Sequence, residues 1–176
     1  YPEEVFIRSY QPATKGHTGQ IKKALQVLAG AKRPLIYFGG GVVLGNAAAE
    51  LTELVKLLGA PTTGTLMGLG AYDSTDRQFI GMLGMHGARA SNLLVEECDL
   101  LMVVGARLGD RATGRLDSFC PKTGIVHIDI DACEVGKLRI PQVGITADAA
   151  DALNALLPLL HNNNHEPWLE RVAACK

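Results

Sequence analysis

The chain has 176 residues, of which 47% are hydrophobic and 20% charged, and its formal net charge is −1. That composition is typical of one globular domain large enough to bury a core, and it excludes a disordered chain. A net charge this small gives no electrostatic reason to bind nucleic acid or an anionic membrane, and no apolar run approaches the roughly 18 residues of a membrane span.

The cysteines and histidines give no sign of a metal site. The four cysteines show neither C-x-x-C spacing nor a zinc-like spacing with histidine, so we expect reduced thiols in a cytoplasm-like compartment. His161 and His165 flank three asparagines, which predicts a solvated tail. The chain starts at Tyr1 and stops at Lys176 inside a predicted helix, and we expect it to be a piece of a longer polypeptide.

Short apolar runs alternate with helical periodicity after an extended lead-in over residues 1–16. The expected strands cover residues 34–38, 61–65, 100–104, 125–130 and 143–146. The expected helices cover residues 19–29, a segment capped by Asn46 and stopped by Gly59, 90–97, 149–160 and 166–175. Residues 64–87 are rich in Gly and Met without a clear period, and we interpret them as an ordered loop.

Buried strands that alternate with helices predict an α/β fold built on an open, doubly wound parallel sheet. We expect residues 1–18 to be a linker, residues 19–160 to be the domain, and residues 161–176 to be a linker with the start of another segment. Such sheets bind ligands at the carboxyl ends of their strands, near the point where the strand order reverses.

Two glycine-rich segments are candidates for ligand contact. Gly39-Gly40-Gly41 follow the first strand, where exposed N–H groups could meet a pyrophosphate, although Leu44 replaces the third glycine of G-x-G-x-x-G. A tight strand-to-helix turn explains these glycines equally well. In Gly81–Gly87 the methionines could pack against a flat ring and His86 could donate a hydrogen bond, while a structural histidine is the alternative.

Charged residues follow three of the later strands. Gly105–Arg111 carries two arginines and an acid, which suits an anionic ligand, although an Asp–Arg clasp within the loop is the alternative. Asp129 and Asp131 end the next strand, where an acid commonly holds ribose, and Asp131 could instead cap a turn. Asp148 could hold a ligand or, more simply, cap the helix that starts at Ala149.

Two common catalytic signatures are missing. The sequence contains neither a G-x-S-x-G nucleophile elbow nor a G-x-x-x-x-G-K-[ST] phosphate loop, and no Cys/His pair stands out as nucleophile and base. The residues therefore predict a nucleotide-binding scaffold without its own reaction centre.

Read together, these segments resemble a known family. The matching strings are Arg8-Ser9-Tyr10, Gly16-His17, Gly19–Ala24, Thr65–Gly70, Gly81–Gly87, Gly105–Arg111 and His127–Asp131. In order and spacing they resemble the central domain of acetohydroxyacid (acetolactate) synthase catalytic subunits, within the thiamine-diphosphate enzyme superfamily. The resemblance covers about Phe6 to Leu160. The Gly-Met-Leu-Gly-Met-His-Gly string is its most specific part.

The resemblance implies a three-domain transferase that condenses two pyruvates, or pyruvate with 2-ketobutyrate, in isoleucine and valine biosynthesis. Thiamine diphosphate and Mg²⁺ would bind the outer domains, and FAD would bind this one in a structural role. It also implies a homodimer or larger assembly, a separate regulatory subunit and a bacterial cytoplasmic location, and we expect the chain alone to be inactive. The alternatives are a middle domain of a related decarboxylase or oxidase, binding ADP or nothing, and a stand-alone nucleotide-binding module.

The resemblance also implies roles for individual residues. The FAD-contacting positions would be Arg8, Gly39, Gly40, Gly41, Thr65, Leu66, Met67, Leu83, Gly84, Met85, His86, Gly105, Ala106, Arg107, Arg111, Asp129, Ile130, Asp148 and Ala149. Met85, Asp110 and Arg111 would face the substrate channel, where the arginine holds the second substrate's carboxylate and herbicides bind. The family usually reads Arg-Phe-Asp-Asp-Arg where this chain has Leu108 and Gly109 at the second and third positions. No catalytic residue and no metal ligand is expected in this chain.

Overall fold

The computed structural model describes residues 3, 6–9 and 11–176, so Tyr10 of the lead-in string lies outside the described residues. Its centre is one sheet of six strands: β1 Pro34–Phe38, β2 Thr62–Gly64, β3 Phe79–Met82, β4 Leu100–Val104, β5 Gly124–Asp129 and β6 Val143–Thr146. The strand order is β3-β2-β1-β4-β5-β6, and every neighbouring pair is parallel. The doubly wound parallel sheet is confirmed, and its order reverses between β1 and β4.

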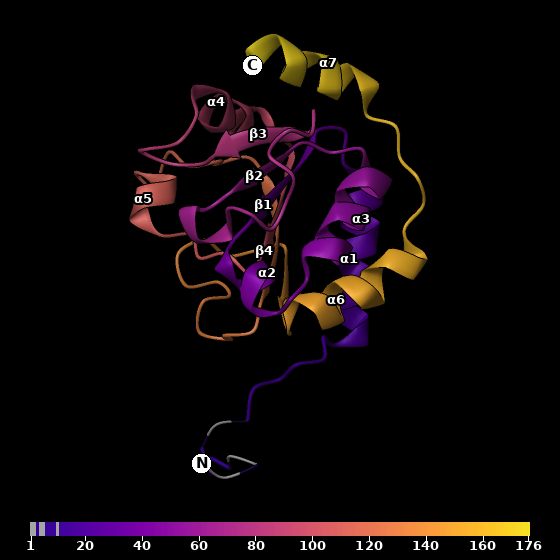
Figure 1. Ribbon diagram of the computed structural model, residues 1–176, viewed down its shortest axis with the longest axis vertical. Coiled ribbons are helices and arrows are strands. Elements are labelled where there is room, and N and C mark those ends of the chain that lie inside the picture. Colours follow the sequence, from indigo (N-terminus) through magenta and orange to yellow (C-terminus); the bar gives the residue numbers. More distant parts are fainter. Residues whose placement is uncertain (1–2, 4–5, 10) are drawn as a thin grey trace.

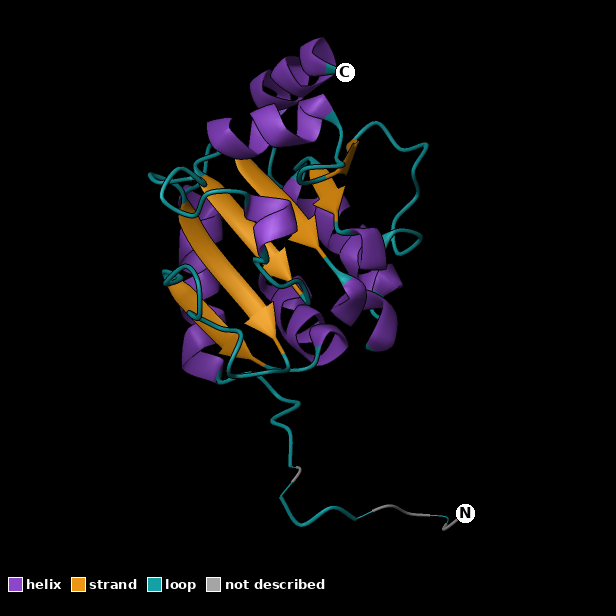
Figure 2. Cartoon of the chain, turned by 90° about the vertical axis from the view of Figure 1, so that its left-hand side faces the viewer, coloured by secondary structure: helices purple, strands orange, loops and turns teal. Residues whose placement is uncertain are grey.

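Helices cover both faces of this sheet (Figures 1 and 2). The helices α1 Thr18–Gly30, α3 Ala48–Leu58 and α6 Ala149–Leu156 pack on one face. The helices α4 Arg89–Glu97, α5 Asp110–Thr113 and α7 Glu166–Cys175 contribute to the other. The short helix α2 Gly40–Leu44 lies at the carboxyl end of β1. No helix in the described part of the chain is long and apolar enough to cross a membrane.

The central strands are apolar at every position because both of their faces are covered. All five residues of β1 and all five of β4 are buried. Along β1, Leu35 and Tyr37 enter the core beside α4, while Ile36 and Phe38 enter the core beneath α1, α3 and α6. This alternation follows from the two-residue period of a strand, and a continuous apolar run therefore identifies a strand buried on both faces.

The structure corrects the expected loop over residues 64–87. This segment contains the one-turn 3₁₀ helix η1, Leu66–Gly68, and the edge strand β3. The strand lacks a clear sequence signal because it is only four residues long, has one paired edge, and includes Gly81. The expected sheet of five strands therefore has six.

Two expectations about helix ends are also wrong. Asn46 does not cap α3: the helix begins after Ala47 without a side-chain cap, and Asn46 instead takes a left-handed conformation with φ 49° in the turn from α2. The helix expected over residues 149–160 stops at Leu156, and residues 157–159 form the 3₁₀ turn η2. Pro158 accounts for this change, because it has no N–H to continue the α-helical pattern.

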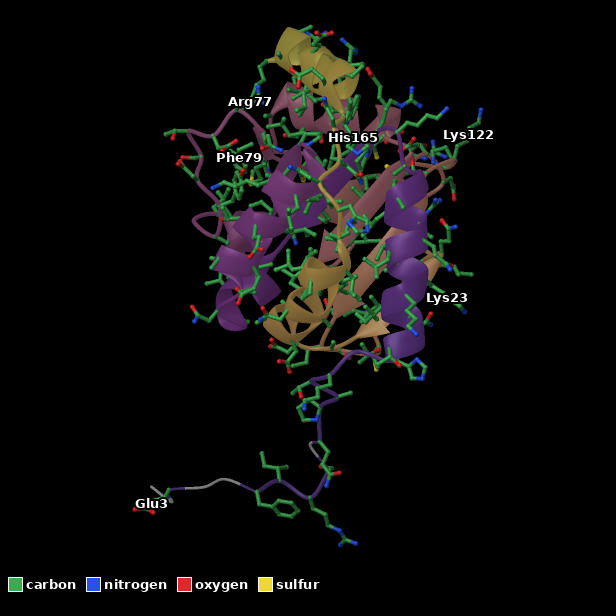
Figure 3. All side chains as sticks on the ribbon, turned by 90° about the vertical axis from the view of Figure 1, so that its right-hand side faces the viewer. Glu3, Lys23, Arg77, Phe79, Lys122 and His165 are labelled. Carbon is green, nitrogen blue, oxygen red and sulfur yellow. The ribbon has the colours of Figure 1, made fainter. Side chains whose placement is uncertain are left out.

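The segment after α6 returns to the domain. The Asn163 N–H donates to the Leu57 carbonyl at 3.0 Å, and His165 is half-buried beside this connection (Figure 3). The expected solvated tail is therefore only partly solvated. Helix α7 then packs Trp168 and Val172 into the same core as α4. The domain limits expected from the sequence stay a prediction, but α7 packs here with residues 19–160.

Candidate functional site

The candidate site lies at the carboxyl ends of β1 and β4, where the strand order reverses. Gly39–Gly41 follow β1 and Gly105–Arg111 follow β4. Their backbones interlock: the Gly39 N–H donates to the Val104 carbonyl at 3.0 Å, and the Gly41 N–H donates to the Gly105 carbonyl at 2.9 Å.

The glycines allow these two loops to touch. A Cβ atom on Gly39 would overlap the Gly105 carbonyl, and one on Gly41 would lie 2.6 Å from the Gly105 Cα. Gly40 differs, since its nearest neighbour is the Met67 side chain at 3.2 Å. The tight-turn interpretation therefore explains Gly39 and Gly41. Of the three amides, only that of Gly40 makes no backbone bond within the described residues.

The loop after β2 places an apolar surface beside this turn. The Thr65 N–H donates to the Phe38 carbonyl at 2.9 Å, and the Thr65 hydroxyl accepts from the Gly68 N–H at 3.0 Å. These bonds form η1 and direct Leu66 and Met67 outward, with the Met67 side chain 75% exposed. Exposed apolar residues on a well-ordered loop are typical of a surface that another group covers.

The loop after β3 is locked against α5. The Met85 N–H donates to the Arg111 carbonyl at 2.9 Å, and Gly84 lies against the Arg111 carbonyl and the Ala112 backbone. Leu83 is buried, while Met85 is 71% exposed and His86 is exposed. Two motifs whose bonded residues, Met85 and Arg111, are 26 positions apart in sequence therefore form one surface. The exposed His86 side chain does not fit the structural-histidine alternative.

Asn92 positions this loop, and the sequence analysis missed it. Its amide oxygen accepts from the Gly84 N–H, and its amide nitrogen donates to the Gly84 carbonyl, both at 3.0 Å. The side chain thus satisfies both backbone groups of one glycine. A sequence signal was available, because asparagine is unfavourable in a helix interior unless its side chain makes specific hydrogen bonds there.

The loop after β4 exposes its charges and buries its apolar residue. Arg107, Asp110 and Arg111 are exposed, whereas Leu108 is buried in the core beside α4. The Asp110 carboxylate accepts from the Arg111 backbone N–H at 2.9 Å, and the described ion pairs include none between their side chains. The expected alternative, an Asp–Arg clasp, is therefore not found, and both guanidinium groups face solvent.

Position 109 has room for a side chain. Gly109 is the N-cap of α5 with φ −70°, and a Cβ atom there would meet nothing within 4 Å. We expect Gly109→Asp to raise the free energy of unfolding by about 0.5–1 kcal/mol, because it caps α5 and restricts the unfolded chain. Urea unfolding measures the change. Gly109→Ala separates the two effects, since it lacks the cap, and a destabilised Asp variant would contradict this account.

His127 on β5 makes a hydrogen bond to the loop after β4. It is buried on β5, and its Nε2 lies 3.1 Å from the Ala106 carbonyl oxygen. Because that oxygen only accepts, Nε2 carries the proton. Among the residues described, Nδ1 has no partner. Burial lowers the pKa of His127, and the nearby Asp129 opposes that effect. The side chain is therefore neutral and holds Ala106 in place.

The lowered pKa makes stability depend on pH. As the pH falls through about 6.5, the unfolded chain binds this proton before the folded chain does, so stability is full above that pH and declines below it. One proton gives a slope of at most about 1.4 kcal/mol per pH unit. His127→Gln can still donate to Ala106 but does not titrate. Its free energy of unfolding, measured with urea above and below about pH 6.5, should therefore decline less than that of the unchanged protein. His165 also has a lowered pKa and is present in both proteins, so its contribution to the pH dependence is the same in each. Equal slopes of stability against pH in the two proteins would contradict a role for His127.

Three acids at the ends of β5 and β6 stabilise turns with one carboxylate oxygen. Asp129 Oδ1 accepts from the Asp131 N–H at 2.9 Å, and Asp131 Oδ1 accepts from the Cys133 N–H at 2.9 Å. Asp148 Oδ1 accepts from the Ala150 N–H at 2.9 Å and caps α6, as the simpler interpretation predicted. Their second oxygens take no part in these bonds. Next to them Ile130 is exposed, and Ala149 is buried.

The structure does not bring every predicted residue to this surface. Arg8 is exposed in the lead-in, which runs away from the body of the domain (Figure 1). The other predicted residues end or follow one of the six strands at its carboxyl end. Within the described ranges, no three His, Cys, Asp or Glu side chains come together as metal ligands.

Comparison with known proteins connects this arrangement to a family. Residues 21–156 match the central domain of thiamine pyrophosphate enzymes. The chain is 44% identical over 161 residues to the acetolactate synthase large subunit of Haemophilus influenzae, which covers 92% of the chain and 28% of that relative. It is 43% identical over 168 residues to the acetolactate synthase isozyme 3 large subunit of Escherichia coli, with 95% and 29% covered.

The similarity extends to an archaeal relative. Over 178 residues the chain is 41% identical to the probable acetolactate synthase large subunit of Methanocaldococcus jannaschii, with 99% of the chain and 30% of the relative covered. The chain thus spans just under a third of the length of the curated relatives it matches. With its parallel six-stranded sheet and a match over residues 21–156, the chain belongs to the thiamine pyrophosphate enzyme central domain family.

Proposed function

We propose that this chain is the central, FAD-binding domain of an acetolactate synthase large subunit. One observation carries the proposal: the Met85 N–H donates to the Arg111 carbonyl. This bond brings together two of the motifs by which the sequence resembles that enzyme, at the carboxyl edge where such sheets bind ligands. The 40–44% identity to acetolactate synthase large subunits supports the same assignment.

The chemistry of the exposed groups fits FAD. Leu66, Met67 and Met85 form adaptable apolar contacts suited to a flat isoalloxazine ring. The Arg107 guanidinium and the Gly40 N–H are suited to a pyrophosphate. On the β5 and β6 side, the second carboxylate oxygens of Asp129 and Asp148 could accept from hydroxyl groups. These groups follow successive strands of the sheet, which suits an extended ligand.

The proposed parent condenses two pyruvates, or pyruvate with 2-ketobutyrate, in the synthesis of isoleucine and valine. In this proposal thiamine diphosphate and Mg²⁺ bind the parent's other domains, and the flavin has a structural role. Arg111 and Asp110 face the substrate channel, where the exposed guanidinium would pair with a keto-acid carboxylate. The proposal includes a homodimer or larger assembly, a separate regulatory subunit and a bacterial cytoplasmic location.

A titration of the purified chain with FAD tests this proposal. Flavin fluorescence should change saturably, and ADP and NAD should bind more weakly than FAD. Met67→Ala and Met85→Ala should weaken FAD binding about 5- to 30-fold, because each removes ring contact of roughly 1–2 kcal/mol from an exposed side chain. Exposed Leu159 lies at the end of η2, away from the carboxyl edge, and Leu159→Ala is the matched control. Binding of ADP without FAD would instead assign the chain to a non-flavin relative.

A further inference from the structure

Two buried cysteines from different parts of the chain meet at the end of α4. Cys98 is the residue after α4, and Cys120 lies in the turn before β5. Both side chains are buried. The Cys98 Sγ donates to the Val95 carbonyl at 3.1 Å, and the Cys120 Sγ donates to the same oxygen at 3.2 Å. The two thiols therefore meet at one carbonyl oxygen.

This shared oxygen explains what the thiols do in the reduced protein. The last carbonyls of an α-helix have no partner within the helix, and Val95 lies in the last turn of α4. The two S–H groups satisfy its oxygen inside the core. If the thiols are oxidised to a disulfide, both donors are lost and the Val95 carbonyl is left buried without them, which is unfavourable.

The backbone on either side of the pair is firmly held. The Thr123 hydroxyl donates to the Cys98 carbonyl and Arg139 donates to the Cys120 carbonyl, both at 2.9 Å. Cys120 has φ 45°, in the left-handed region that a side chain other than glycine rarely adopts. The neighbouring bonds thus hold Cys120 in a strained conformation in which its sulfur contacts the same Val95 oxygen as Cys98.

The chain between the two cysteines carries the second loop of the candidate site. Residues 98–120 include β4, the loop Gly105–Gly109 and α5. Helix α4, which ends just before Cys98, also carries Asn92, and Asn92 holds Gly84. A bond between the two sulfurs would therefore close a covalent ring around one half of the site and remove the hydrogen bonds that end the helix supporting the other half.

We propose that Cys98 and Cys120 are a modification site at which a low-molecular-weight disulfide of the glutathione class forms an intramolecular disulfide. One protein thiolate attacks the reagent's S–S bond, makes a mixed disulfide and releases one reagent thiolate, which takes up a proton. The second protein thiolate then attacks the mixed disulfide and releases the other half as a thiol. Two electrons and two protons pass from the protein thiols to the reagent.

The surroundings of the pair set the conditions for this reaction. The neighbouring Cys120 thiol and then burial raise the pKa of Cys98, so the reactive thiolate is scarce in the folded protein. Reaction therefore proceeds through local opening of the turn that holds Cys120, and it is slower than reaction at exposed Cys133. The pair responds to sustained oxidation, and thiol reagents reverse it.

Peptide mass spectrometry after incubation with oxidised glutathione tests the proposal. We expect a peptide that joins Cys98 to Cys120, has lost two hydrogen atoms and is restored by dithiothreitol. Cys133 provides the internal control, since it should carry only a glutathione adduct. The double variant Cys133→Ser/Cys175→Ala removes the other two thiols and should still form the cross-link. Neither Cys98→Ser nor Cys120→Ser should form it.

Hydrogen exchange gives a second readout that does not depend on flavin binding. Oxidation should speed amide exchange in the last turn of α4 and in the loop Gly105–Gly109. The proposal is overturned if Cys98 and Cys120 stay reduced or carry only separate adducts under conditions that fully modify Cys133. It is also overturned if the cross-link forms and exchange in both segments stays unchanged.

Discussion

Replacing Gly84 with alanine is expected to lower the free energy of unfolding by about 3–5 kcal/mol, through backbone strain and overpacking together. Gly84 has φ 109°, and its added Cβ would overlap the Arg111 carbonyl and lie 2.9 Å from the Ala112 Cα. Both neighbours are backbone atoms of α5, so the clash is relieved only if the helix or the loop moves. Urea unfolding measures the loss.

The same substitution should separate the two halves of the candidate site. Because the Met85 N–H bonds to the Arg111 carbonyl, any shift of Gly84 moves Met85 away from α5. Gly109→Ala is the matched control, since it adds the same methyl group near α5, in open space and at φ −70°. If Gly84→Ala unfolds at the same urea concentration as this control, the loop after β3 does not pack against α5 as described.

Replacing Trp168 with alanine should cost about 3–5 kcal/mol of stability, as truncation of a buried tryptophan commonly does. Trp168 is 3% exposed, and its indole Nε1 donates to the Pro34 carbonyl at 2.9 Å. That carbonyl belongs to the first residue of β1, so the indole connects α7 to the start of the central strand. Thermal unfolding measures the loss of stability.

A conservative variant separates the contributions of packing and hydrogen bonding at this position. Trp168→Phe keeps most of the apolar contact but leaves the Pro34 carbonyl without its donor, and it should cost about 1–3 kcal/mol. Trypsin gives a second readout, because released α7 exposes the chain at Arg171, which otherwise pairs with Glu97 of α4. Unchanged stability and cleavage in Trp168→Ala would mean that α7 contributes nothing to the domain.

The parts of the fold that were predictable are those in which burial leaves a simple sequence pattern. Strands β1 and β4 are buried on both faces and appear as unbroken apolar runs. Strand β3 has one paired edge and contains Gly81, so its pattern is too short and mixed to identify. Asparagine is a common helix cap, but here Asn46 adopts a left-handed conformation in the turn after α2.

The position of the candidate site was predictable, but its internal contacts were not. Glycines and charges that follow strands locate the carboxyl edge of the sheet, because all parallel strands end there. The sequence does not reveal that Gly39 and Gly41 contact Gly105, since the contact joins segments more than 60 residues apart. Asn92 was missed although its partner Gly84 lies only eight residues away, because Gly84 belongs to the loop after β3 and Asn92 to the interior of α4.

The interlocked glycines divide this domain into a part that resists sequence change and a part that tolerates it. Gly39, Gly41 and Gly105 pack directly against one another, so a side chain at any of them displaces the loops that follow β1 and β4. Leu66, Met67 and Met85 protrude from well-bonded loops and can be exchanged at little cost to folding. A new ligand preference can therefore evolve, or be engineered, in these three side chains while the contact between the loops after β1 and β4 stays the same.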